Sequence, residues 1–176
     1  MSSVPIIAFE PIPAEAEIFR RVTARFKDVR LHLVALGEQP GEAEIHLSRS
    51  LDSSSLLPIG EAQTSLFKNT DEVGTLRVPV KRLDDFKSEW EGYSRILLKI
   101  DVQGFELAVL KGATETLRRC AHVYVECSER ELYVGQALYQ DAAGFLETQG
   151  FELRSRHNET VLDRRLVQAD YLFRHR

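Results

Sequence analysis

The chain has 176 residues, 43% of them hydrophobic and 28% charged, which is typical of one soluble globular domain. Its formal net charge is −4, and its basic residues are scattered in pairs such as Arg118 and Arg119, so no electrostatic footprint for nucleic acid is visible. No stretch approaches the length of a membrane span, and no basic segment followed by an apolar run begins the chain. We therefore expect no nucleic acid partner and no membrane partner.

Apolar and alternating segments in the first half predict strands at residues 4–10, 30–36 and 43–47, a helix at 13–27 and a long loop at 48–69. The apolar run over residues 4–10 is typical of a strand buried on both faces, and Pro11 ends it. Long loops inside a compact domain often carry function.

The second half alternates strands and helices. The pattern predicts strands at residues 75–80, 96–101, 122–127, 151–156 and 171–173, and helices at 105–118 and 136–149. Helices between strands favour the α/β class with a largely parallel sheet.

The two cysteines give a cue to the compartment. Cys120 and Cys127 lack the short spacing and the histidine partners of a zinc site, and both flank or end a hydrophobic strand. Buried free thiols are the usual state there, which fits a reducing compartment. We expect a cytoplasmic protein without a metal site, and none of the five histidines stands out as catalytic.

Two of the predicted strands end in an acidic residue, Glu10 and Asp101. In an open α/β sheet, ligands bind beyond the carboxyl ends of the strands. Glu10 ends the first strand, where a carboxylate can accept a hydrogen bond from each hydroxyl of a ribose. A solvated strand end is the alternative for Glu10. Glu126 lies near the end of the strand at 122–127.

Asp101 ends the most hydrophobic strand and is followed by Val102-Gln103-Gly104. Lys99 shares its strand face because side chains alternate along a strand. Its place at the carboxyl end of a strand makes Asp101 a candidate for contact with a bound ligand. Two structural alternatives remain open for it, a Lys99–Asp101 ion pair and a cap of the helix that begins near Phe105.

Several short motifs occur in a fixed order along the chain. They are AFEPIP at 8–13, ALG at 35–37, SSSL at 53–56, LDD at 83–85, LKIDVQGFE at 98–106, LKGA at 110–113 and VE at 125–126. This ordered set, which covers residues from about 6 to 155, resembles the signature of FkbM-family methyltransferases.

The resemblance implies a Rossmann-like, seven-stranded methyltransferase fold, a three-layer α/β/α sandwich in which residues 1–176 form a single domain. It implies S-adenosylmethionine as the cofactor and methylation of a hydroxyl oxygen on a small molecule or sugar. The implied catalytic residues are Asp101, with Lys99 or Glu106 placing the acceptor. The implied cofactor-binding residues are Glu10, Pro11, Ala35, Leu36, Ser54, Ser55 and Asp101. For Asp84 and Asp85, helix capping is the simpler explanation.

Members of this family carry an earlier strand and a glycine-containing loop ahead of the segment that matches Glu10. Only residues 1–3 precede the first predicted strand, and the chain has no Asp-x-Gly-x-x-Gly pattern, so we expect the fold to be incomplete at its N-terminus. Unpaired strand edges would then invite association into a homodimer. The competing interpretation is a noncatalytic, degenerate binding module or a gene fragment. A nicotinamide-dependent dehydrogenase is disfavoured because its Gly-x-Gly-x-x-Gly turn is also absent.

Overall fold

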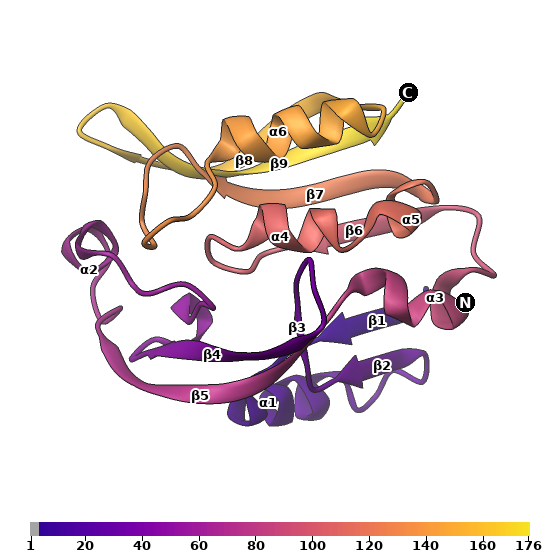
Figure 1. Ribbon diagram of the computed structural model, residues 1–176, viewed down its shortest axis with the longest axis horizontal. Coiled ribbons are helices and arrows are strands. Elements are labelled where there is room, and N and C mark those ends of the chain that lie inside the picture. Colours follow the sequence, from indigo (N-terminus) through magenta and orange to yellow (C-terminus); the bar gives the residue numbers. More distant parts are fainter. Residues whose placement is uncertain (1–3) are drawn as a thin grey trace.

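The computed structural model describes residues 4–176 as a mixed α/β structure, which confirms the predicted fold class (Figure 1). Its strands are β1 (Ile6–Phe9), β2 (Val29–His32), β3 (Ala35–Leu36), β4 (Gly41–Ser48), β5 (Glu72–Lys81), β6 (Ile96–Ile100), β7 (Cys120–Ser128), β8 (Phe151–Leu162) and β9 (Arg165–His175). Its α-helices are α1 (Pro13–Thr23), α2 (Glu61–Leu66), α3 (Lys87–Trp90), α4 (Glu106–Lys111), α5 (Thr114–Leu117) and α6 (Tyr139–Thr148). No helix within residues 4–176 is long and apolar enough to span a bilayer.

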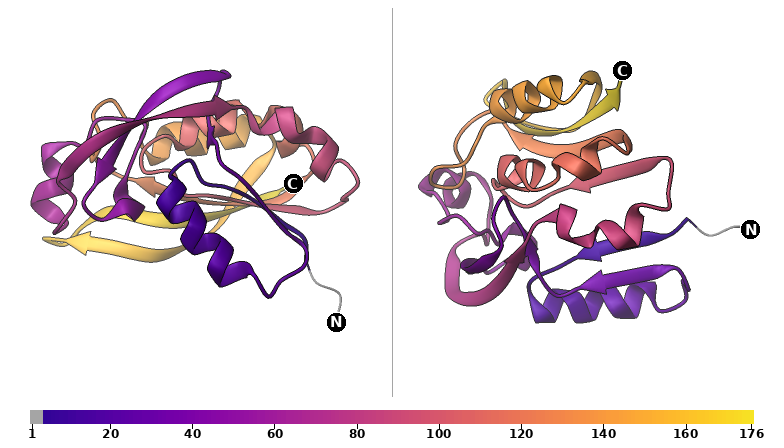
Figure 2. Two further views of the ribbon diagram at one scale, coloured as in Figure 1. Left: turned by 90° about the horizontal axis from the view of Figure 1, so that it is seen from below. Right: turned by 45° about the vertical axis from the view of Figure 1, so that its right-hand side comes forward.

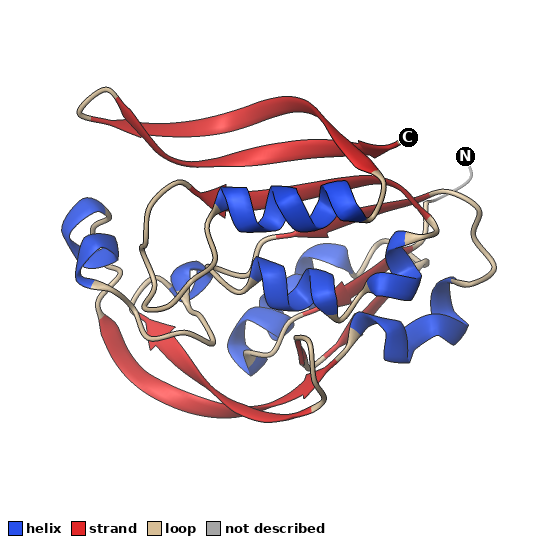
Figure 3. Ribbon diagram, turned by 45° about the horizontal axis from the view of Figure 1, so that its top comes forward, coloured by secondary structure: helices blue, strands red, loops and turns tan. Residues whose placement is uncertain are grey.

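The main core lies on a four-stranded sheet with the order β6-β7-β9-β8. Strand β7 pairs parallel with β6 and antiparallel with β9, and β8 pairs antiparallel with β9. Helices α4 and α6 cover one face of this sheet (Figure 3). Val123 and Val125 of β7 are fully buried, as are Leu110 of α4 and Leu146 of α6, because each element turns its apolar side to the others.

Strands β1 and β2 form a separate parallel sheet, with α1 packed along β2. In Figures 1 and 2, β1 lies next to β6 in the stack of strands and points the same way, yet the two strands do not pair. Alternate residues of a strand direct their backbone groups to opposite sides. Because the amides of Ile6 and Glu10 bond to the β2 side, those of Ile7 and Phe9 are directed away from it.

A third sheet has the order β3-β5-β4. The strand predicted at residues 43–47 lies within β4, which pairs antiparallel with β5, and β3 pairs parallel with the end of β5. This arrangement corrects two expectations. The segment 30–36 is not one strand, because the chain leaves β2 after His32 and joins another sheet at Ala35. The segment 48–69 is not only a loop, because it holds a 3-10 turn, η1 (Leu51–Ser53), and helix α2.

Two further expectations need correction. The strands form three sheets with as many antiparallel as parallel pairings, rather than one largely parallel sheet. The helix predicted over 105–118 is divided into α4 and α5 around Gly112. The backbone carbonyl of Gly37 approaches Gly112 so closely that a Cβ built there would lie 2.0 Å from the Gly37 oxygen. A straight, continuous helix with a side chain at this position would collide with that backbone.

Candidate active site

The acidic residues predicted at strand ends lie at one end of the strands. Glu10 directly follows β1, Asp101 directly follows β6, and Glu126 lies near the end of β7. Strands β6 and β7 are parallel, and β1 points the same way, so all three carboxylates belong to the carboxyl-end edge where α/β folds bind ligands (Figure 1).

Glu10 is more than half buried, and its geometry leaves one oxygen for a ligand. The backbone amide of Ile12 donates to Glu10 Oε1 at 2.7 Å. Within residues 4–176, Oε2 has no hydrogen-bond partner. Burial is the main cause that raises the pKa of Glu10, opposed by the Ile12 bond and assisted by the charge of Glu15. Pro11 fixes the chain between the carboxylate and the buried Ile12.

Asp101 is held from two sides. Lys99 Nζ donates to Asp101 Oδ2 at 2.9 Å, and Gln103 Nε2 donates to Oδ1 at 3.0 Å. The predicted Lys99–Asp101 ion pair is therefore present, and Lys99 is an exposed residue within it. Within the described part of the chain, Asp101 makes no bond to the first turn of α4, so the capping alternative is not realised. The Asp101 side chain keeps 40% of its surface exposed, which leaves it accessible.

Gln103 joins the strand ends, a role that the sequence analysis missed. Its Nε2 also donates to Glu126 Oε2 at 3.2 Å, and its Oε1 accepts from the Tyr133 hydroxyl at 2.9 Å. Its backbone carbonyl accepts from the Ser55 hydroxyl at 2.6 Å. The residue adopts a left-handed φ of 54°, a conformation rare for side chains other than Asn and Asp. Its position inside the LKIDVQGFE motif was the available signal.

Glu126 is mostly buried and shares its carboxylate between two amides. Besides the Gln103 bond, Gln168 Nε2 donates to Glu126 Oε1 at 3.3 Å. Burial raises the pKa of Glu126 to about 7, and the neighbouring charges of Asp101 and Asp170 add to the increase. A carboxyl with a pKa near neutral pH is suited to take a proton in a reaction.

Glu106 points inward rather than toward the strand ends. It is 4% exposed, and the amide of Gly104 donates to Glu106 Oε1 at 2.9 Å. Burial raises its pKa to about 7 against the lowering effect of this and other backbone bonds. These contacts tie Glu106 to the turn that carries Gln103, and its predicted part in placing an acceptor stays a prediction.

The serine and alanine–leucine motifs border the same edge. The Ser54 hydroxyl accepts from the Ser48 amide at 3.1 Å, and Ser55 is buried against Gln103, so both hydroxyls hold their loop in place. Ala35 lies in one apolar cluster with Ile12, and Leu36 packs against the main core. The fold thus brings the segment after Glu10 next to β3. Roles for these four motif residues in cofactor binding stay predictions.

The two aspartates of the LDD motif act as caps. Both carboxylate oxygens of Asp84 accept from the first turn of α5, at 2.9 Å from the Thr116 amide and 3.0 Å from the Glu115 amide. Asp85 Oδ2 accepts from the Arg82 amide at 3.1 Å. Capping is confirmed for both, although Asp84 caps a helix 30 residues further along the chain.

Comparison with known proteins shows which family this chain resembles. Residues 2–153 match the family model described as the methyltransferase FkbM domain. The 2-O-methyltransferase NoeI of Sinorhizobium fredii (strain NBRC 101917 / NGR234) is 32% identical over 137 residues, which are 74% of this chain and 56% of that protein. Methyltransferase 1 of Beauveria bassiana (strain ARSEF 2860) is 32% identical over 120 residues, 61% of this chain and 48% of that protein. The chain thus spans about half the length of these curated relatives.

A solved structure also resembles this one. The crystal structure of methyltransferase FkbM from Methylobacillus flagellatus KT superposes with a TM-score of 0.55 over 95% of this chain and 36% of that chain, at 14% sequence identity. A likeness at that identity shows the fold alone. The family model covers most residues of this chain and confirms the resemblance that the ordered motifs indicate. The chain belongs to the FkbM methyltransferase domain family.

Proposed function

We propose that this chain is a methyltransferase domain that uses S-adenosylmethionine to methylate a hydroxyl oxygen of a small molecule or sugar. The observation that carries the proposal is the set of carboxylates Glu10, Asp101 and Glu126 at the carboxyl-end edge of β1, β6 and β7. Membership of the FkbM family supports it, and the name of the relative NoeI specifies an oxygen acceptor for that protein.

The nucleoside half of the cofactor fits the residues present. Glu10 Oε2 is free to accept a ribose hydroxyl while Oε1 is engaged by Ile12, and Ala35 lies in the cluster behind that segment. For the methionine half, the described residues place no strand and no glycine-rich loop between β1 and β6. When bound, the cofactor supplies a methyl group on a sulfonium, which is already a good leaving group.

The acceptor side needs positioning and a base. Methyl transfer to oxygen gains chiefly from holding the hydroxyl in line with the methyl group. Lys99 and Gln103 hold the Asp101 carboxylate in place from two sides, so it can accept a hydrogen bond from an acceptor hydroxyl. Glu126 stands on the other side of the Gln103 amide and can receive the proton, because its pKa lies near 7.

A second candidate function is a noncatalytic binding module of the same family. The observation that favours it is the separation of the β1–β2 sheet from the β6-β7-β9-β8 sheet, which divides Glu10 from Asp101. Such a module would keep the fold and the nucleoside contacts but would not align donor and acceptor.

Two measurements distinguish these candidates. The first is a thermal melt of the chain with and without S-adenosylhomocysteine, where ligand at 100 times its Kd should stabilise the fold by about 2.7 kcal/mol. The second is transfer of labelled methyl from S-adenosylmethionine to a panel of sugars and small hydroxyl compounds. A shifted melt with transfer supports the enzyme, a shifted melt without transfer supports the binding module, and an unshifted melt contradicts both.

Asp101→Ala tests the assignment of the acceptor side. Turnover should fall far more than cofactor affinity, because the carboxylate acts on the acceptor. The matched control is Asp163→Ala in the exposed turn between β8 and β9, which should change neither. Equal losses of turnover and affinity in Asp101→Ala would mark this residue as a binding or folding residue instead.

Two further expectations belong to the proposal. The cytoplasm remains the predicted compartment, supported by Cys120 and Cys127, which are both buried and free. A homodimer through strand edges remains a prediction as well, supported by the unpaired sides of β1 and β6.

A further inference from the structure

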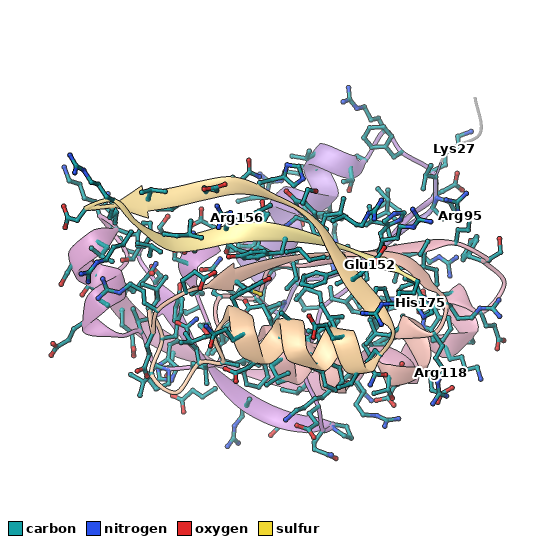
Figure 4. The ribbon with its side chains drawn as sticks, turned by 90° about the horizontal axis from the view of Figure 1, so that it is seen from above. Lys27, Arg95, Arg118, Glu152, Arg156 and His175 are labelled. Carbon is teal, nitrogen blue, oxygen red and sulfur yellow. The ribbon has the colours of Figure 1, made fainter. Side chains whose placement is uncertain are left out.

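Four arginines from three separate segments of the chain meet at one cleft of about 680 Å³. It is lined by Arg95, Arg118, Arg119 and Arg174, together with His122 and His175. Figure 4 shows Arg95, Arg118 and His175 gathered at one end of the molecule. The scattered basic pairs of the sequence had indicated no such concentration of charge, because the arginines come from the segments before β6 and β7 and from the end of β9.

The cleft lies at the end of the sheet opposite the carboxylates. Arg95 and Arg119 immediately precede the parallel strands β6 and β7, and Arg174 lies near the end of β9, which runs antiparallel to β7. Cys120, in the cleft, and Glu126 are separated by six steps along β7, a distance of about 20 Å. The cleft is thus separate from the candidate active site.

Acidic neighbours do not neutralise this charge. No Asp or Glu is among the residues that line the cleft. Arg118 is paired with Glu115, whereas within residues 4–176 neither Arg95 nor Arg174 has an ion-pair partner. Glu152 is opposite Arg174 in the β8–β9 ladder, but its carboxylate accepts from Arg154 at 3.1 Å.

One guanidinium is already held in place. Arg119 Nη2 donates to the backbone carbonyls of Glu91 at 3.2 Å and Tyr93 at 3.3 Å. These bonds fix the side chain but do not cancel its charge, since a carbonyl oxygen carries no full negative charge. Binding an anion therefore costs less side-chain conformational entropy, because Arg119 is already fixed in the free protein.

We infer that this cleft binds a small ligand through a diphosphate group. The planar guanidinium pairs with phosphate oxygens in a bidentate way, so arginine is the residue best suited to this anion. The volume falls within the range of small-molecule sites. Several guanidiniums match the two or more negative charges of a diphosphate better than the smaller charge of one orthophosphate.

The test is calorimetric titration of the whole chain with inorganic pyrophosphate and, separately, with orthophosphate. Pyrophosphate should bind at one site, at least about tenfold more tightly than orthophosphate, and more weakly as ionic strength rises. Arg95→Gln and Arg174→Gln should each weaken pyrophosphate binding about tenfold, because each removes a charge-assisted contact. The control Arg164→Gln, in the exposed β8–β9 turn, should leave binding unchanged.

A second measurement needs no variant in the cleft. In proton NMR spectra, the ring signals of His122 and His175 should move on addition of pyrophosphate, whereas those of His46 on β4 should not. Asp101→Asn should bind pyrophosphate like the unchanged chain, which separates this site from the proposed activity. Absence of pyrophosphate binding, or an equal loss in Arg164→Gln and in the cleft variants, would overturn the inference.

Discussion

Two glutamates of this chain share a raised pKa of about 7 but have opposite surroundings. Glu106 is enclosed by α4 and the turn before it, and its main contacts are backbone amides. Glu126 lies at the strand ends between the side-chain amides of Gln103 and Gln168, next to other carboxylates. Burial is the first cause in both, yet Glu126 is only partly buried whereas Glu106 is 4% exposed. This difference supports the proposal that Glu126 accepts the proton, and the predicted part of Glu106 in placing an acceptor stays a prediction.

Glu126→Gln tests the proposed base. In the unchanged chain, kcat/KM for methyl transfer should rise as the pH increases through about 7, because Glu126 must lose its proton to accept another. In the variant, kcat/KM should no longer rise with pH through this range. Its kcat should be lower by about a hundredfold or more. The matched control is Glu147→Gln on the exposed surface of α6, which should change neither the pH profile nor kcat. A pH profile unchanged in Glu126→Gln would remove this residue from the mechanism.

Glu106→Gln tests the cost of a buried carboxylate. A carboxyl with a folded-state pKa of about 7 and an unfolded value near 4.5 binds more protons in the folded state over that range. The free energy of unfolding should therefore fall as pH rises from 4.5 to 7, by up to about 3 kcal/mol, and then level off. The decline should be flatter in the variant, because Gln does not titrate. Gln can still accept the hydrogen bond from the Gly104 amide, so the local structure is kept. Chemical denaturation at several pH values measures the slope, and an equally steep slope in the variant would contradict the assignment.

Among the elements, the contact between Gly37 and Gly112 joins the segment after β3 to the end of α4. Gly112→Ala should destabilise the fold by about 3 kcal/mol or more, and lower the melting temperature by roughly 10 °C, because the new methyl would meet the Gly37 carbonyl at 2.0 Å. Gly144→Ala in α6 is the control, since its Cβ would meet nothing within 4 Å, and it should be neutral or slightly stabilising. Equal melting temperatures for the two variants would show that the backbone yields at Gly112.

Local patterns predicted most elements of this chain, because periodicity and apolar runs report burial directly. Hydrophobic alternation indicated the strand at residues 43–47, which lies within β4, and the order of strands and helices. Such patterns could not predict that residues 30–36 are divided between two sheets. Nothing in this apolar run indicates that its two ends pair with different strands. The break at Gly112 likewise depends on a carbonyl 75 residues away in sequence.

The candidate site was predictable to a similar degree. Strand-end acids and an ordered set of motifs pointed to Glu10 and Asp101 without coordinates. Gln103 was missed because its part depends on Ser55, Glu126 and Tyr133, partners from three separate segments that only the folded chain brings together. The arginine cleft was missed for the same reason, and composition argued against it.

For the whole molecule, the separation of β1 from β6 predicts a pattern of hydrogen exchange. The amides of Ile7, Phe9, Leu97 and Lys99 are directed away from their only paired neighbours, because the amides of alternate residues face β2 and β7. They should exchange at least about tenfold faster than the amide of Val123, which lies at the centre of its sheet. Residue-resolved exchange by NMR measures this, and equal protection would mean that the two sheets pair in solution.

We expect the divided sheet to couple affinity for the proposed cofactor to the rigidity of the fold. Glu10 and Asp101 stand on different sheets, so no ladder of hydrogen bonds fixes their separation. Their spacing depends instead on packing, chiefly the ring contacts of Phe9 with Phe86 and the Gly37–Gly112 approach. A ligand that spans both sheets binds only those molecules in which the two sheets are packed together. Its apparent Kd rises as the fraction of such molecules falls. Substitutions at Phe86 are therefore expected to weaken binding of the proposed cofactor through the packing of Phe9.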